Sequence, residues 1–164
     1  MNIALIGMMG SGKSTIGKLL ADKLNMKFID TDEEIIKLSN CSINKIFETQ
    51  GEKAFREIEK IVLSKVLKLD NQIISTGGGI IKEEQNRELL KGVTTIYLQA
   101  DDSTLFERVK NDNTRPLLNT NNLLTTIQTI LSERKHLYEK ATLIIDTTNK
   151  SPENIVKEIM EKIK

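Results

Sequence analysis

Cysteine, tryptophan and proline are scarce in this chain. Its 164 residues include one cysteine, no tryptophan and two prolines, and only 4% of them are aromatic. The single Cys41 cannot form an intrachain disulfide, so we assign it a structural role. No apolar run approaches the roughly twenty residues that a membrane-spanning helix requires, so no membrane partner is expected.

An excess of charge of one sign is also missing. The 24 Lys and Arg residues nearly balance the 23 Asp and Glu residues, which leaves a formal net charge of +1. Duplex nucleic acid binds proteins with a strong basic field, so no nucleic-acid partner is expected. The N-terminus enters an apolar strand pattern directly, without the features of a signal peptide, which predicts a cytoplasmic protein. The length predicts one domain over residues 1–164, and we expect a monomer.

Against this background, residues 7–15 carry one dense motif, Gly-Met-Met-Gly-Ser-Gly-Lys-Ser-Thr. Gly, four residues, Gly, Lys and Ser form the pattern of a phosphate-binding loop, or P-loop. Backbone N–H groups of such a loop surround phosphate oxygens, Lys13 can reach the β and γ phosphates of a nucleoside triphosphate, and the Ser14 hydroxyl can coordinate Mg²⁺. Residues 3–6 are apolar and residues 16–24 are apolar at helical spacing, so strand, loop and helix follow in the required order. An ordinary strand-to-helix turn is the alternative, which both the residues and their context disfavour.

Two carboxylates lie at the end of a second predicted strand. Residues 27–30 predict this strand, and Asp30 and Asp32 follow its apolar part. Ligands of open α/β sheets bind at the carboxyl ends of the strands, so this position favours a ligand site. Helix capping explains the same residues equally well, because Thr31 and Glu34 match a capping box for a helix over residues 32–38.

Residues 41–68 predict helical structure that is interrupted at Gly51. In the longer second part the apolar residues fall on one side of the helix, and Glu59 projects into the same stripe. Arg56 lies three residues earlier, within reach of an ion pair that would place its guanidinium at the edge of the buried face. A simple surface pair is the alternative.

Three successive glycines, Gly77, Gly78 and Gly79, follow a third predicted strand over residues 72–75. Such a run is costly in conformational entropy, so it indicates that something approaches the backbone closely. At the carboxyl end of a strand we expect substrate or phosphate there. A flexible turn is the alternative.

The second half of the chain continues the alternation with helices over residues 82–90 and 103–110 and a strand over residues 94–98. Residues 111–122 are rich in Asn and Thr and carry Arg115. In a phosphotransferase this segment would be a mobile lid, and a plain surface loop is the alternative.

A helix over residues 123–141 shows an apolar face with Arg134 in its middle, which suggests an anionic ligand. His136 points to the opposite side, so we assign it no chemistry. Residues 143–146 predict the fifth strand, and Ser151 is the expected N-cap of the last helix. Five short strands alternating with helices predict a three-layer α/β domain with a mostly parallel sheet.

With these segments in place, the sequence resembles the shikimate kinases, small members of the nucleoside monophosphate kinase-like group of P-loop proteins. The likeness runs essentially from end to end, and its first motif is shared by many kinases, whereas the ordered set is much more specific. The matching motifs are the P-loop at 7–15, Asp-Thr-Asp at 30–32, Phe55 and Arg56 with Glu59, Gly-Gly-Gly at 77–79, Arg-Pro-Leu-Leu at 115–118, and Arg134 with Tyr138.

The resemblance implies transfer of the ATP γ-phosphate to the 3-hydroxyl of shikimate, in the pathway to chorismate and the aromatic amino acids. It implies that Asp32 holds the reacting hydroxyl and that Arg56 and Arg134 bind the shikimate carboxylate. A planar carboxylate accepts paired N–H bonds from arginine, which explains two positioned guanidiniums. Glu59 would support Arg56, and the backbone of Gly77, Gly78 and Gly79 would contact the ring.

For the nucleotide half, the resemblance implies that Lys13 and Arg115 meet the transferring phosphate and that Asp30 orders the shell of one Mg²⁺ ion through water. Arg108 and the loop over residues 147–152 would flank the adenine, and the family strand order is 2-3-1-4-5. The ATP-binding residues implied in this way are Gly10, Ser11, Gly12, Lys13, Ser14, Thr15, Arg108 and Arg115.

Other proteins of the same architecture are the competing hypotheses. Gluconate kinases and nucleotide kinases share the fold but lack the combination of Asp-x-Asp, triple glycine and Arg-Pro-Leu-Leu. A non-catalytic ATP-binding sensor is the alternative from another class, since a fold alone does not establish activity. The presence of Lys13, Ser14, Asp32 and Arg115 argues against it.

Overall fold

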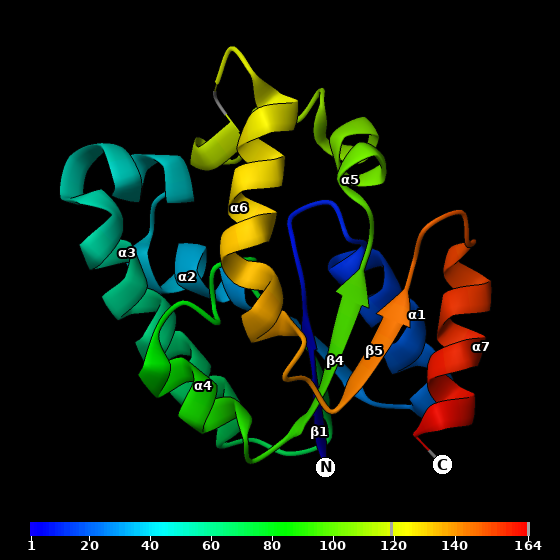
Figure 1. Cartoon of the computed structure of the whole chain (residues 1–164). Coiled ribbons are helices and arrows are strands. Elements are labelled where there is room, and N and C mark those ends of the chain that lie inside the picture. The colour runs from blue at the N-terminus through cyan, green and yellow to red at the C-terminus, as the bar shows by residue number, and fades with distance from the viewer. Residues whose placement is uncertain (119, 164) are drawn as a thin grey trace.

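The computed structural model describes residues 1–118 and 120–163 (Figure 1). The strands are β1 (Asn2–Ile6), β2 (Lys27–Asp30), β3 (Gln72–Ser75), β4 (Thr94–Gln99) and β5 (Leu143–Asp146). The helices are α1 (Lys13–Leu24), α2 (Thr31–Ser39), α3 (Ile43–Leu67), α4 (Glu84–Leu90), α5 (Asp102–Val109), α6 (Leu123–Tyr138) and α7 (Pro152–Lys162), with one turn of 3-10 helix at Pro116–Leu118. No helix in these described ranges is both long and apolar enough to cross a membrane.

The strands form one parallel sheet in the order β2-β3-β1-β4-β5, which confirms the order implied by the resemblance. Strand β1 lies in the centre, so the P-loop leaves the middle of the sheet. Ser75 of β3 pairs with Asp30 of β2 on one side and with Leu5 of β1 on the other. The loops that follow β1, β2 and β3 therefore start side by side at the carboxyl edge of the sheet.

Helices cover both faces of the sheet, so the strands are buried on both sides and the predicted three layers are confirmed. Alternate residues of β1 show the division. Ile3 and Leu5 pack with α1 and α7, whereas Ala4 and Ile6 face the second core, to which α3, α4 and α6 contribute. Cys41 is half-buried against this second core, in keeping with its structural role.

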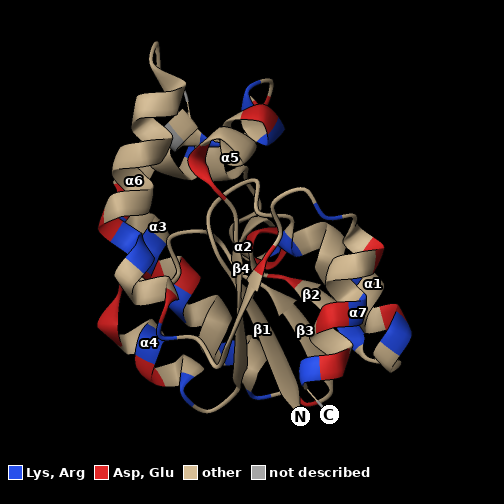
Figure 2. Cartoon of the chain, turned by 45° about the vertical axis from the view of Figure 1, so that its right-hand side comes forward, with Lys and Arg blue, Asp and Glu red and all other residues tan. Residues whose placement is uncertain are grey.

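Charges of both signs alternate over the outer helices, and the central strands carry none (Figure 2). The helices therefore bury apolar stripes against the sheet and expose mixed polar faces. On α6 the buried face comprises Ile127, Ile130, Arg134 and Tyr138, while His136 is exposed, as predicted.

The predicted helix boundaries differ from the observed ones by a turn or less, and the predicted cap of α2 was wrong. Helix α6 ends at Tyr138 rather than residue 141, and α4 begins at Glu84 rather than residue 82, because the backbone after the triple glycine first makes short-range turns. The N-cap of α2 is Asp30, whose Oδ1 accepts from Asp32 N–H at 2.9 Å. Thr31 instead lies inside the helix, and its hydroxyl accepts from Gly77 N–H at 3.1 Å.

Gly51 interrupts α3 as predicted. Its backbone has φ 84° and ψ 172°, a conformation that is almost exclusive to glycine, while the residues on either side are helical. The break redirects the chain between the short first part of α3 and the long second part that carries Arg56 and Glu59.

We expect Gly51→Ala to destabilise the protein by about 1–3 kcal/mol, because a side chain strains this backbone conformation. The space around Gly51 is open, so no steric clash contributes. Gly92→Ala is the matched control, since Gly92 has no positive φ and only ordinary contacts around a Cβ. Urea denaturation of both variants measures the difference. Equal stability of the two would show that strain at Gly51 is absent.

Candidate active site

The P-loop wraps the space in front of the amino-terminal end of α1. Gly12 is the N-cap of α1 in a left-handed conformation with φ 93°, and no acidic residue follows in the first turn. The positive end of the helix dipole and its free N–H groups therefore face the loop. This arrangement is the anion site that the motif predicts.

Lys13 lies within the loop with its ammonium group directed back onto the backbone. Its Nζ donates to the carbonyl oxygens of Gly7 at 2.9 Å and Met8 at 2.8 Å. Burial, reinforced by the nearby charge of Arg115, lowers the pKa of Lys13 to about 7. The group thus needs an anion beside it to remain fully protonated above neutral pH.

Oxygen ligands gather beside the P-loop at the end of β2. Ser14 Oγ donates to Asp30 Oδ2 at 2.7 Å and lies 3.1 Å from Ser75 Oγ. A hydroxyl and a carboxylate are hard oxygen donors of the kind that Mg²⁺ prefers, and Mg²⁺ typically takes few protein ligands beside substrate phosphates. The predicted pair of Ser14 and Asp30 therefore fits this ion. Ser75 is an addition that the sequence did not reveal, because its position depends on strand order.

Arg108 connects the P-loop to the loop after β5. Its Nη1 donates to the carbonyl of Gly10 at 3.1 Å and to Thr147 Oγ1 at 3.3 Å, and its Nη2 donates to the carbonyl of Thr147 at 3.2 Å. Arg108 and residues 147–152 thus lie on the outer side of the P-loop, away from Asp32. Thr15 is exposed at the start of α1.

A cavity of about 490 Å³ opens on the other side of the P-loop. Eight of the predicted site residues line it: Asp32, Arg56, Glu59, Gly77, Gly78, Gly79, Arg115 and Arg134. Burial, with the neighbouring charge of Asp30 second, raises the pKa of Asp32. Asp32 is therefore a stronger base than an exposed aspartate.

Apolar residues also line this cavity. The sequence analysis did not single them out as site residues. Phe47 and Phe55 pack with ring centroids 4.8 Å apart, beside Met9 of the P-loop and Ile43. Their spacing is that of ordinary core residues, so no sequence signal separates the two roles. The lining thus combines apolar and charged groups, and the Arg56 guanidinium lies over the Phe55 ring, 5.0 Å from its centroid.

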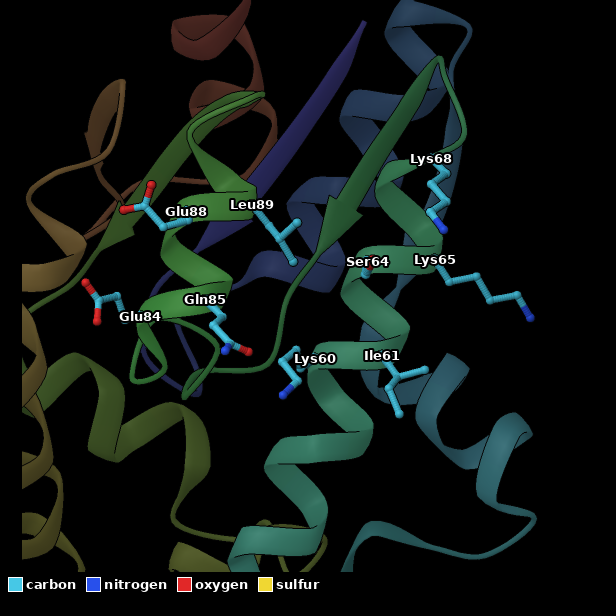
Figure 3. A pocket seen from close by; sticks show the side chains of 9 residues that line it. All are labelled: Lys60, Ile61, Ser64, Lys65, Lys68, Glu84, Gln85, Glu88 and Leu89. Carbon is cyan, nitrogen blue, oxygen red and sulfur yellow. The ribbon is translucent and has the colours of Figure 1, made fainter.

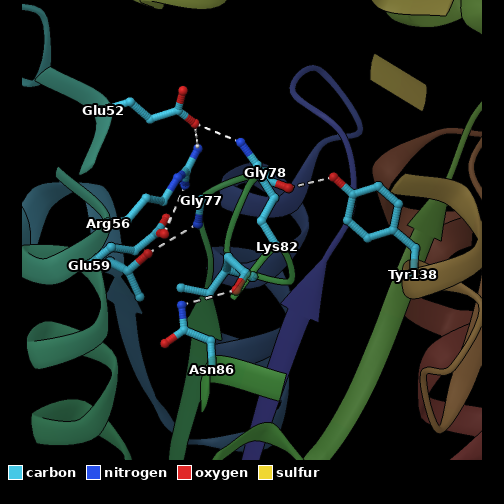
Figure 4. A network of polar contacts seen from close by, with 10 residues as sticks. Glu52, Arg56, Glu59, Gly77, Gly78, Lys82, Asn86 and Tyr138 are labelled. Carbon is cyan, nitrogen blue, oxygen red and sulfur yellow. Dashed lines mark hydrogen bonds and ion pairs between the residues drawn. The ribbon is translucent and has the colours of Figure 1, made fainter. Parts of the chain in front are cut away.

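The predicted pair of Arg56 and Glu59 is buried rather than superficial. Arg56 Nη1 donates to Glu59 Oε2 at 2.8 Å, and Glu59 has no exposed surface (Figure 4). Complete burial raises the pKa of Glu59, and the charge of Arg56 opposes that rise. Arg56 Nε is buried without a hydrogen-bond partner in the described structure.

The triple glycine makes room for these side chains. A Cβ at Gly79 would collide with the guanidinium of Arg56, and one at Gly77 would lie 3.0 Å from both Asp32 Oδ1 and Glu59 Oε1. The sequence correctly indicated a close approach to this backbone. The groups observed to approach are the protein's own charged side chains.

Arg134 reaches the cavity from α6. Its side chain is buried, and Nη1 lies near Gly78 with no hydrogen-bond partner in the part of the chain that the structure describes. One turn later, the Tyr138 hydroxyl donates to the carbonyl of Gly78 (Figure 4). The Tyr138 ring stacks on Tyr97 with centroids 5.0 Å apart. Tyr138 thus fixes α6 against the triple glycine.

Arg115 lies above the cavity in the segment that the sequence suggests is a lid. Its Nε donates to Asp112 Oδ2 at 3.2 Å, and 39% of its side chain is exposed. Asn119 of this segment lies outside the described residues.

A second hollow of about 860 Å³ lies between α3 and α4, far from the P-loop (Figure 3). Its lining includes the exposed side chains of Ile61 and Leu89, while Glu84 and Glu88 of α4 point away from α3. It contains no converging hydrogen-bond donors of the kind seen around Arg56 and Arg134, so we assign it no chemistry.

The fold and the site together define a class of protein. A P-loop on a central parallel strand, a hydroxyl and a carboxylate in contact beside it, and a separate cavity with buried arginines describe a small-molecule kinase. The nucleotide half and the acceptor half meet between Lys13 and Asp32.

Comparison with known proteins specifies the family. The sequence model of the family described as shikimate kinase matches residues 9–164. Shikimate kinases of Rippkaea orientalis and Caldicellulosiruptor saccharolyticus are 48% and 46% identical, over 99% and 97% of this chain and 87% and 93% of theirs. A solved structure of shikimate kinase from Acinetobacter baumannii in complex with shikimate superposes with a TM-score of 0.97 at 35% identity, over 99% of this chain and 92% of that chain. The chain therefore belongs to the shikimate kinase family, whose members transfer phosphate from ATP to shikimate.

We expect nucleotide binding to draw a proton onto Lys13. At about pH 8, roughly one unit above its lowered pKa, the free enzyme holds Lys13 mostly neutral, and the negative charge of ADP raises that pKa and favours the ammonium. Titration calorimetry in buffers of different ionisation enthalpy measures the uptake. Lys13→Met should bind ADP without this uptake, and an equal uptake by both proteins would contradict the assignment.

Proposed function

We propose that this protein phosphorylates the 3-hydroxyl of shikimate and that the cavity beside the P-loop holds the acceptor. The observation that carries the proposal is the pair of buried nitrogens without partners, Arg56 Nε and Arg134 Nη1, that belong to the cavity lining. Buried donors without partners are costly, so they indicate a ligand that supplies acceptors. A planar carboxylate suits two guanidiniums.

The acceptor hydroxyl belongs at the opposite end of the cavity. Asp32 lies there next to Lys13 and can accept the hydrogen bond of the hydroxyl that reacts. The hydroxyl oxygen attacks the γ phosphorus of ATP, the bond from that phosphorus to the bridging oxygen breaks, and ADP leaves. Asp32 orients the oxygen, and its raised pKa favours acceptance of the proton. Lys13 offsets the negative charge on the phosphates while the phosphoryl group passes from the bridging oxygen to the hydroxyl oxygen.

We also propose that Ser14 and Asp30 hold one Mg²⁺ ion, Ser14 directly and Asp30 through water. When bound, this ion offsets charge on the β and γ phosphates. The support is the contact between the two side chains at 2.7 Å and their position beside the anion site. The monomeric state, the cytoplasmic location and the extent of the domain stay predictions.

The competing small-molecule kinases require a different cavity. A nucleoside monophosphate would bring a base and its own phosphate, whereas this cavity offers two buried guanidiniums, which suit a planar carboxylate, beside Phe47 and Phe55. A sensor without activity would have no need of Asp32 and Lys13 beside each other. The site therefore favours a compact carboxylic acid with hydroxyl groups.

Turnover with different acceptors tests the proposed function. In a coupled assay of ADP release, we expect ATP consumption with shikimate and little with gluconate or nucleoside monophosphates. Lys13→Met should fold normally and abolish turnover, because it removes the charge that stabilises the phosphates. A faster reaction with gluconate or a nucleotide than with shikimate would overturn the proposal.

We expect Arg134→Ala to weaken shikimate binding by about 1.5–3 kcal/mol, as is usual for loss of a hydrogen bond to a charged group. ATP affinity should change little, because Arg134 lies on the acceptor side. Equilibrium titration with each substrate separates the two effects. Lys135→Ala is the matched control, since that neighbour on α6 is exposed. Loss of ATP binding with normal shikimate binding would move Arg134 to the nucleotide site.

We further propose that residues 32–60 form the acceptor-binding segment and residues 111–122 a lid that closes over both substrates. Arg115 anchors the lid to the transferring phosphate. Arg115→Ala should lower the turnover rate by about a hundredfold or more and leave binding of shikimate alone nearly unchanged, because its contact forms with charge in the transition state. Hydrogen exchange of residues 111–122, with α7 as internal reference, should slow when ADP and shikimate are both present. Equal exchange in both states would show a static loop.

A further inference from the structure

Glu52 and Lys82 form a charged pair outside the cavity. This pair contacts Arg56, one of the two arginines that we propose bind the acceptor carboxylate. Glu52 Oε1 accepts from Lys82 Nζ at 2.7 Å and from Arg56 Nη2 at 3.3 Å (Figure 4). Glu52 follows Gly51 on α3, and Lys82 follows the triple glycine, so the contact joins the two segments that carry the acceptor site. Neither residue is among those that line the cavity.

Without Lys82, the surroundings of Arg56 would be too negative for an anionic substrate. Arg56 contacts two carboxylates, Glu52 and Glu59, and a single guanidinium cannot neutralise both. Glu59 is completely buried and held at 2.8 Å, so its contact with Arg56 is fixed. Glu52 is half-exposed and can move. Its Oε1 lies closer to Lys82 Nζ than to Arg56 Nη2.

The geometry points to Lys82 as a positioning residue for acceptor recognition: its ammonium group neutralises Glu52 and draws it from Arg56, which keeps the guanidinium available to the substrate carboxylate. This inference rests on the proposed binding of shikimate by Arg56 and Arg134. The hydrogen bond from Lys82 also holds the pKa of Glu52 below its ordinary value, so Glu52 is a carboxylate at neutral pH. An uncompensated negative charge on Glu52 would weaken the attraction between Arg56 and the substrate carboxylate.

The first test is Lys82→Met. Its KM and dissociation constant for shikimate should rise about two- to fivefold, the range expected for a partly exposed charge pair. KM for ATP and the turnover number at saturation should stay within error, because Lys82 contacts neither phosphate nor reacting oxygen. Raising the salt concentration should shrink the difference, since exposed charges are screened. Lys82→Arg should keep the normal KM.

The double variant separates charge compensation from a mechanical tie. If Lys82 acts by neutralising Glu52, then Glu52→Gln combined with Lys82→Met should return KM for shikimate close to the original value. A tie that merely holds α3 to the loop predicts that the double variant is no better than Lys82→Met. Lys91→Met is the matched control, because Lys91 pairs with Glu88 at the end of α4, in a similar exposed contact remote from the cavity.

An unchanged KM in Lys82→Met, or an equal rise in Lys82→Met and the double variant, overturns the inference. Denaturation of each variant shows whether altered folding accounts for a change. The proposed function is tested separately by Arg134→Ala. If Arg134→Ala weakens shikimate binding and Lys82→Met does not, only the role of Lys82 is wrong; if neither has an effect, the acceptor site itself is misplaced.

Discussion

The buried pair of Arg56 and Glu59 is the contact on which the acceptor half of the site depends. A carboxylate with no exposed surface is tolerated only because a guanidinium donates to it, and loss of one partner from such a pair typically costs about 3–5 kcal/mol. The pair in turn requires Gly79, where a Cβ would collide with Arg56. Helix α3, the loop after β3 and the cavity between them are therefore mutually dependent. The ion pair that secures the packing of α3 thus also lines the cavity.

Much of the fold followed from sequence because its signals are local. The five strands, the break at Gly51 and the P-loop each depend on residues within a few positions. Strand order came from the family resemblance, because pairing between distant segments leaves no local pattern. Ser75 was missed for the same reason: its contact with Ser14 exists only once β3 lies beside β1 and β2.

The carboxylate of Asp30 makes two contacts at once, one within its own helix and one with the P-loop. Its Oδ1 accepts from Asp32 N–H and caps α2, while its Oδ2 accepts from the Ser14 hydroxyl beside the P-loop. The sequence suggested Thr31 with Glu34 as the cap of this helix, whereas Asp30 provides it, because a carboxylate has two oxygens and can serve the cap with one and Ser14 with the other. The sequence also indicated that something approaches the triple glycine, but it could not say whether a ligand or the protein's own side chains did so.

The packing of α5 on the P-loop has a mechanical consequence. Gly10 lies so close to Val109 that a Cβ there would overlap its side chain, and Arg108 in the preceding position donates to the carbonyl of Gly10. The last turn of α5 is thus locked to the phosphate loop, and any hinge for residues 111–122 lies after Val109. The phosphate loop and the base of that segment are therefore joined by direct contacts at two adjacent residues, and the sheet takes no part in this connection.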